Sequence, residues 1–171
     1  LMFGRVDLMI SGGLNQQLSD TFTVGVCALG AVAEEIPRPF DERGDGFLIG
    51  EGGILFLLKR LADAERDGDD VYAVIRGVHG SSEAESKSMI APTVKSVRRS
   101  IRNTLDAVRV DGRGIGVVDT HGSANHLSDV VEAQSLAEEL RPEGAGPDAP
   151  PVRVTAIKSH IGHLYGGSGA A

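Results

Sequence analysis

Residues 158–169, KSHIGHLYGGSG, and residues 119–129, DTHGSANHLSD, are the two stretches that decide how this chain of 171 residues folds. Each places a histidine beside glycines directly after an apolar run typical of a β-strand, VRVTAI before the first and GIGVV before the second. In α/β sheets the loops at strand ends present side chains to ligands, so the two histidine loops can converge on one pocket. The alternative is structural, because a histidine in a glycine-rich turn can simply begin a helix.

Both loops resemble segments of the β-ketoacyl synthases. Residues 121–132, HGSANHLSDVVE, are similar to the loop that reads HGTGTxxGDxxE in that family, and residues 158–169 are similar to its KSxxGHxxGAAG segment. Upstream, residues 38–53, RPFDERGDGFLIGEGG, resemble the family's RPFDxxxDGFVxGEGxG. The motifs occur in the family's order and at similar separations, so the resemblance is specific. It covers nearly all of the chain, most weakly at residues 81–110 and 141–151.

The resemblance implies an α/β, thiolase-like fold, which is built from two similar halves. The chain would be incomplete: residues 1–68 would form the end of the N-terminal half, and residues 69–171 most of the C-terminal half, truncated at its end. The residues themselves agree, because strand, loop and helix patterns alternate and predict a mixed, mostly parallel sheet covered by helices. The acidic turn DGDD at residues 67–70 is the best internal boundary.

Hydrophobic periodicity and turn residues predict the individual elements. Strands are expected at residues 6–10, 47–50, 54–58 and 71–78, and the run ILFLL at 54–58 is typical of a strand buried on both faces. Helices are expected at residues 59–68, 94–110 and 130–140, the last with Ala133, Leu136, Ala137 and Leu140 on its inner side. Residues 19–35 are assigned as mixed helix and loop, and residues 81–92 and 141–151 as surface connections.

The activity that the resemblance implies is a decarboxylative condensation, in which an acyl group held on cysteine joins a malonyl thioester that loses carbon dioxide. His121 and His163 match the family's two catalytic histidines, which would stabilise the enolate as hydrogen-bond donors. Lys158 matches the active-site lysine, and Glu132, with Asp129, the supporting acids. A buried pair of Lys158 and Glu132 would hold the loops and bias the protonation of the histidines. A purely structural ion pair is the alternative.

The family's two threonines that approach the phosphopantetheine arm of a carrier protein correspond here to Ser123 and Asn125. Between them Ala124 adds a methyl group where the backbone usually approaches closely, and Ser128 replaces a glycine. These departures leave a second hypothesis open, a catalytically silent homologue that serves as a partner or chain-length subunit. The arm would be the substrate carrier, and no covalently bound cofactor is expected.

The nucleophilic cysteine of the family precedes the SGG turn at residues 11–13, so we expect it upstream of this chain and expect the chain alone to be inactive. Cys27 is the single cysteine. No charged neighbour in the run TVGVCALG would stabilise its thiolate, which favours a buried structural thiol.

The composition of the chain limits which binding partners and which cellular compartment are expected. The net charge of −7 argues against nonspecific binding of nucleic acid or of an anionic membrane, and the basic face of the 94–110 helix is interpreted as solvated rather than as a nucleic-acid site. A single cysteine and no apolar run of about 18 residues fit a cytoplasmic protein. The expected partners are an acyl carrier protein, acyl and malonyl thioesters, and a second copy in a homodimer. His121, His160 and His163 could form a zinc site, but the resemblance accounts for two of them, and no metal is expected.

Overall fold

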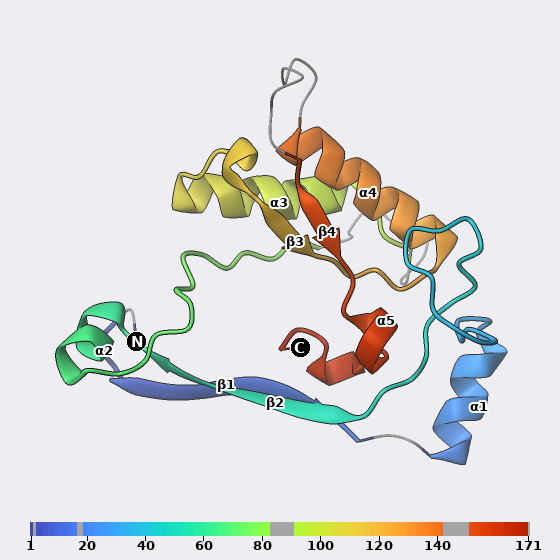
Figure 1. The fold of residues 1–171 in the computed structure, drawn as a ribbon, viewed down its shortest axis with the longest axis horizontal. Helices are drawn as coiled ribbons and strands as arrows, with labels where there is room; N and C mark the ends of the chain where they lie inside the picture. Colours follow the sequence, from blue (N-terminus) through green and yellow to red (C-terminus); the bar gives the residue numbers. More distant parts are fainter. Residues whose placement is uncertain (2, 17–18, 83–90, 142–150, 171) are drawn as a thin grey trace.

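The computed structural model describes residues 1, 3–16, 19–82, 91–141 and 151–170. Its strands are β1 (Leu8–Asn15), β2 (Gly52–Lys59), β3 (Val117–Asp119) and β4 (Arg153–Thr155). Its helices are α1 (Asp20–Ala28), α2 (Leu61–Asp67), α3 (Val94–Val108), α4 (His126–Leu140) and α5 (Lys158–Ile161), with 3₁₀ turns at Gly112–Gly114 and Tyr165–Gly167. The long β1–β2 ribbon lies along one side of the molecule, β3 and β4 with α3 and α4 lie along the other, and α5 sits between them (Figure 1).

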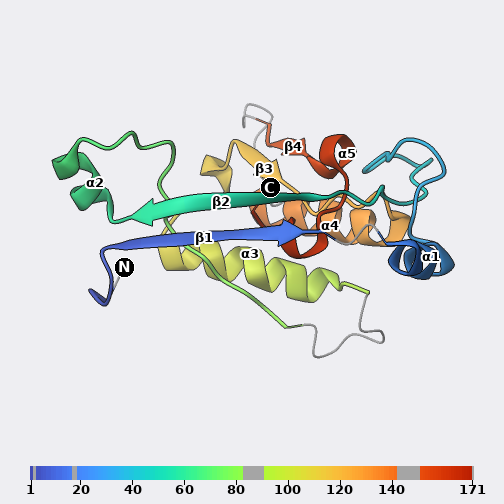
Figure 2. The ribbon, with the colours of Figure 1, turned by 90° about the horizontal axis from the view of Figure 1, so that it is seen from below.

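The strands form two separate pairs. β1 and β2 are antiparallel, from Leu8 opposite Lys59 to Asn15 opposite Gly52 (Figure 2), whereas β3 and β4 are parallel. The described strands are therefore mixed in direction, as predicted: the longer pair is antiparallel, whereas the shorter pair and the isolated bridges Val32–Phe47 and Ile49–His163 are parallel. The paired strands nevertheless come from residues far apart in the sequence.

The β1–β2 ribbon differs from its predicted burial. Its apolar side chains are exposed in this chain, for example Ile10 at 68% and Leu55 at 71%, so the prediction of a strand buried on both faces at residues 54–58 is wrong for this chain. β1 also continues through the glycines that were expected to end it. A Cβ at Gly12 would lie 2.0 Å from the carbonyl oxygen of Ile54, so glycine lets the two backbones pair at that point.

The two long helices pack against each other through polar side chains. Arg98 and Arg102 of α3 donate to the Glu139 carboxylate of α4, at 2.7 Å for Arg98 Nε and 2.7 Å for Arg102 Nη2. Two basic residues of α3 are thus paired with a carboxylate of α4 instead of standing alone in solvent as the interpretation of a solvated face implied. Burial opposes ionisation of Glu139, but the hydrogen bonds from the two arginines outweigh it and lower the pKa of the carboxyl.

α4 begins four residues before its predicted start because Asn125 caps it, accepting a hydrogen bond from the Ser128 amide. Its inner side also differs from the prediction. Leu140 and the polar Ser135 are buried, whereas Ala133 and Ala137 are exposed. The Ser135 hydroxyl donates to the Val131 carbonyl within the helix, and this bond allows a polar residue to be buried where periodicity pointed to alanine.

Residues 71–78 form no strand, and Tyr72 is 99% exposed. The segment has alternating apolar residues but no neighbouring strand to pair with in the described part of the chain. Of the two predicted surface connections, residues 83–90 and 142–150 lie outside the described residues. None of the helices that are described has the length and apolar character needed to cross a membrane.

Two glycines allow the loop after α5 to approach residues 48–50. Gly162 has φ of +76°, and a Cβ there would lie 2.9 Å from the Gly50 backbone. A Cβ on Gly50 would in turn lie 2.3 Å from the Ile161 carbonyl oxygen. Gly162 and His163 of the second histidine loop are therefore in backbone contact with residues 48–50, which precede β2.

We predict that Gly162→Ala lowers the free energy of unfolding by about 2 kcal/mol or more, because its backbone, at φ of 76° and ψ of 176°, costs a residue with a Cβ about 1–3 kcal/mol and the contact with Gly50 adds to it. Urea unfolding followed by circular dichroism measures the difference. The matched control is Gly114→Ala, where an added Cβ meets open space, and its effect should stay within about 0.5 kcal/mol. Equal stability of the two variants would contradict the close approach.

Candidate active site

The parallel pairing of β3 and β4 places the two histidine loops side by side. The Thr120 amide and hydroxyl both donate to the Thr155 carbonyl, at 2.9 and 2.7 Å. Asp119 Oδ1 accepts from the Thr155 hydroxyl at 2.8 Å. The strand ends are thus joined just before the loops diverge, and the imidazole rings of His121 and His163 meet with their centroids 5.5 Å apart in an edge-to-face arrangement.

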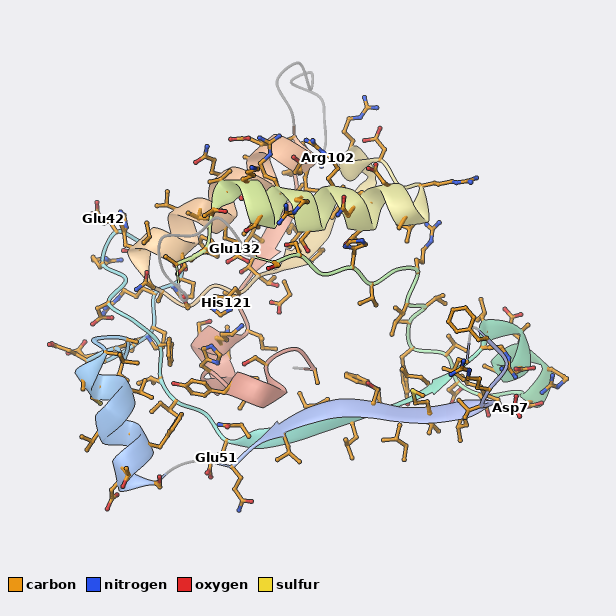
Figure 3. The ribbon with its side chains drawn as sticks, turned by 180° about the vertical axis from the view of Figure 1, so that it is seen from behind. Asp7, Glu42, Glu51, Arg102, His121 and Glu132 are labelled. Carbon is orange, nitrogen blue, oxygen red and sulfur yellow. The ribbon has the colours of Figure 1, made fainter. Side chains whose placement is uncertain are left out.

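Glu132 holds the first loop from α4. Its Oε1 accepts the His121 amide at 2.7 Å and its Oε2 accepts the Gly122 amide at 3.0 Å. His121 and Glu132 lie close together on the inner side of the α3–α4 layer, whereas Arg102 is at its outer edge (Figure 3). The expected pair of Lys158 and Glu132 is not formed among the described residues, because both carboxylate oxygens of Glu132 bind backbone amides instead.

His163 is held by backbone on one side and through its own ring on the other. Its amide donates to the Leu48 carbonyl at 2.7 Å, and its carbonyl accepts the Gly50 amide at 3.1 Å. Its Nδ1 accepts the Tyr165 amide at 2.9 Å. A backbone amide can only donate, so Nδ1 carries no proton, and the neutral ring carries its proton on Nε2. His163 is therefore a hydrogen-bond donor through Nε2.

The environment keeps both imidazoles neutral. Burial, with smaller effects of the neighbouring His121 and Lys158 charges, lowers the pKa of His163 from 6.5 to about 4. His121 is exposed as a residue, but partial desolvation of its ring lowers its pKa, with help from Lys158 and with partial opposition from the carboxylates of Glu132 and Asp129. At pH 7 the pair can therefore offer neutral N–H donors to a developing negative charge.

Lys158 and Asp129 are both buried, at 6% and 4% exposure. No hydrogen bond or ion pair joins the Lys158 ammonium to another residue in the described ranges, so its effect on the site is that of a nearby positive charge. Asp129 accepts the Phe40 amide on Oδ2 at 2.8 Å, and its buried Oδ1 has no partner within the described residues. Asp129 therefore ties the RPFD segment to α4.

The residues expected to contact a pantetheine arm hold the first loop together. Ser123 is buried at 4% exposure, and its hydroxyl lies 3.1 Å from that of Ser128. The exposed Asn125 caps α4. Ala124 between them is fully buried at φ of +54°, a conformation that favours glycine. The family's glycine is thus replaced where the backbone still adopts the left-handed conformation.

The prediction that Cys27 is a buried thiol is wrong, since it is exposed. It lies in the last turn of α1, at the carbonyl end of the helix and not at its N-terminus. His160 is a surface residue, with Nδ1 2.9 Å from the Ser159 hydroxyl. Within the described part of the chain, no group of three or more His, Cys, Asp or Glu side chains is arranged to hold a metal ion.

An aromatic cluster around His163 was not predicted. Tyr165 stacks on the imidazole with ring centroids 4.6 Å apart and an interplanar angle of 27°. Phe47 approaches the same imidazole at 4.7 Å, and Phe22 of α1 contacts the Tyr165 ring at 5.1 Å. Ser168 adds a hydroxyl 3.0 Å from His163 Nδ1. One sequence feature could have indicated part of this cluster: the segment reads GGSG where the family has GAAG, so Ser168 brings a hydroxyl near His163.

Two family profiles match the chain. The profile described as "Beta-ketoacyl synthase, N-terminal domain" matches residues 1–64, and "Beta-ketoacyl synthase, C-terminal domain" matches residues 72–171. A mycocerosic acid synthase-like polyketide synthase of Mycobacterium tuberculosis is 32% identical over 98% of this chain and 8% of its own length. The 6-methylsalicylic acid synthase of Aspergillus niger is 32% identical over 97% of this chain and 9% of its own. The chain thus spans only a small part of these relatives.

Solved structures confirm the predicted α/β, thiolase-like fold. The ketosynthase from module 6 of the bacillaene synthase of Bacillus subtilis 168 superposes with a TM-score of 0.92 at 26% identity, over 99% of this chain and 31% of that one. The ishigamide ketosynthase/chain length factor superposes with a TM-score of 0.83 at 31% identity, over 98% of this chain and 39% of that one. Profiles, relatives and fold agree, and the chain belongs to the β-ketoacyl synthase family.

Proposed function

We propose that this chain supplies the decarboxylating side of a β-ketoacyl-[acyl carrier protein] synthase, an acyltransferase of fatty-acid or polyketide biosynthesis. The observation that carries the proposal is the meeting of the two imidazoles, 5.5 Å apart at the ends of paired strands, with His163 constrained to donate through Nε2. Two neutral imidazoles at this separation suit the stabilisation of one oxygen atom on which negative charge develops.

In the proposed reaction, the bond between the carboxylate carbon and the α-carbon of a malonyl thioester breaks and carbon dioxide leaves. The electron pair becomes an enolate, whose oxygen accepts hydrogen bonds from His121 and His163. The enolate carbon then attacks the carbonyl of an acyl group held as a cysteine thioester, and the cysteine sulfur leaves. Each donor of this kind contributes about 10²- to 10³-fold to the rate.

The remaining site residues support that arrangement. Glu132 orients the His121 loop by binding two successive amides, and Lys158 contributes a positive charge that disfavours protonation of both imidazoles. Asn125, exposed at the start of α4, is the better placed of the two proposed pantetheine contacts, because the Ser123 hydroxyl is buried against Ser128. The phosphopantetheine arm would arrive on an acyl carrier protein, and the complete synthase would be a cytoplasmic homodimer.

The division of the chain into residues 1–68 and 69–171 belongs to the same proposal. α2 ends at Gly68 in the left-handed conformation, and the two family profiles stop and start on either side of it, at residues 64 and 72. Such a helix stop is a natural point at which one half of a duplicated fold would end.

A second candidate function is a silent partner or chain-length subunit. The observation that favours it is Ala124, fully buried at φ of +54° in the loop that would receive the arm. The methyl group of Ala124 keeps a ligand such as the phosphopantetheine arm farther from the backbone than a glycine would. Decarboxylation by the wild-type protein separates the two candidates, because a silent subunit would release no carbon dioxide.

Replacing His121 or His163 by alanine in a complete synthase that contains this chain should slow malonyl decarboxylation by about 10²- to 10³-fold, because each variant loses one donor to the enolate. Acyl loading onto the cysteine should persist, since the thiol takes that group. Mass spectrometry of malonyl and acyl carrier proteins follows both steps. The surface variant His160→Ala should behave as wild type, and a normal rate in either of the two test variants would refute the assignment.

The pH dependence should follow the lowered histidine pKa values. Between about pH 4 and 6.5 the folded His163 stays neutral while an ordinary histidine is protonated, so the acid limb of decarboxylation should have its midpoint below 6.5. In the same window the unfolded chain binds more protons than the folded one, so acidification weakens the fold. NMR titration of His163 should give a pKa near 4. A value at or above 6.5 would rule out the neutral-donor arrangement.

Cys27 should remain unacylated when the chain is incubated with an acyl carrier thioester. It lies in the last turn of α1, whereas activated cysteines lie at helix N-termini or beside cationic groups. Intact-mass spectrometry with Cys27→Ser as the control measures adducts at this position. A stoichiometric acyl adduct that is absent from Cys27→Ser and abolished by His121→Ala would show that Cys27 is the nucleophile.

A further inference from the structure

Two side chains of the turn that follows His163 contact its ring directly. Tyr165 lies over the face of the imidazole, with centroids 4.6 Å apart and planes inclined by 27°. Ser168 reaches its edge, with the hydroxyl 3.0 Å from Nδ1. Both come from the 3₁₀ turn Tyr165–Gly167 and the residue after it. One short segment therefore contacts both the face and the edge of the imidazole ring.

The Tyr165 ring is itself braced. Phe22 of α1 meets it edge-on at 5.1 Å, and Phe47 meets it edge-on at 5.9 Å. Phe47 also contacts the His163 ring at 4.7 Å. The Tyr165 backbone adopts φ of +42°, which is costly for a residue with a side chain and is retained here by these contacts. The imidazole thus packs against an aromatic wall anchored in two other segments.

The Ser168 hydroxyl adds a second hydrogen bond at the same ring atom. Nδ1 already accepts the Tyr165 amide at 2.9 Å, and it carries no proton, so the hydroxyl donates to it as well and the two donors share its single in-plane lone pair. The hydroxyl stands where the family's GAAG segment has an alanine. This chain therefore has a ring contact that an alanine cannot make.

We propose that Tyr165 and Ser168 are positioning residues for His163: the Tyr165 ring sets the plane of the imidazole, and the Ser168 hydroxyl sets its rotation, so that Nε2–H points at the reacting oxygen. The proposal rests on the function proposed above for its catalytic consequence, and on geometry alone for its effect on the ring. A donor aimed in advance needs no reorientation when charge develops, which is the source of its catalytic effect.

The test uses a complete synthase containing this chain, with four variants, Ser168→Ala, Ser168→Thr, Tyr165→Leu and Tyr165→Phe. Ser168→Ala loses one hydrogen bond and should lower kcat for malonyl decarboxylation by about 3- to 10-fold with KM unchanged, and Ser168→Thr should restore it. Tyr165→Leu should lower kcat, whereas Tyr165→Phe, which keeps the ring, should not. The matched control is Ser159→Ala, which removes a serine–histidine contact of 2.9 Å at the surface residue His160.

NMR of the histidine-labelled protein gives a readout that does not depend on catalysis. In Ser168→Ala the Nδ1 resonance of His163 should move toward that of a nitrogen with fewer hydrogen bonds. In Tyr165→Leu the His163 ring protons should lose the upfield shift caused by the stacked ring. An unchanged His163 spectrum in both variants would overturn the proposal. If the spectra change as expected but His163→Ala decarboxylates normally, the positioning is upheld and the proposed function is what fails.

Discussion

The backbone contact between residues 48–50 and His163 is the interaction on which the site depends. The His163 amide and carbonyl bond to Leu48 and Gly50, and the close approach is possible because Gly50 and Gly162 have no Cβ. Just upstream of it, the Gly46 amide donates to the Ala124 carbonyl of the first loop. Residues 46–50 therefore contact both histidine loops.

Around that contact, carboxylates bind backbone rather than cations. Glu132 binds the two amides at the start of the first loop, and Asp129 binds the Phe40 amide of the RPFD segment. Lys158 is left as a buried charge close enough to the imidazoles to lower their pKa values. Glu132 and Asp129 thus hold the backbone of the site in place, whereas Lys158 acts on the imidazoles through its positive charge. This division differs from the ion pair that the motif resemblance implied.

Positions that depart from the family pattern gather at the two loops. Ala124 takes a left-handed conformation usually assigned to glycine, and Ser168 adds a hydroxyl at His163 Nδ1. Tyr165, at a position the motif leaves open, stacks on the same ring. These departures therefore lie beside the two histidines, whose own positions in the motifs are kept.

The sequence by itself determined the family, the α/β class, the two histidine loops and most helices, because glycine spacing and apolar periodicity are local signals. It also indicated that His121 and His163 would meet, since each follows a strand. The tertiary structure decided the rest. The antiparallel pairing of β1 with β2 and the contacts of Phe22 and Phe47 with the Tyr165 ring join residues far apart in the chain. The exposure of Cys27 and the acceptance of amides by Glu132 depend on how neighbouring segments are oriented once the chain has folded. No local pattern encodes such contacts, because they arise only when separate segments are brought together by folding.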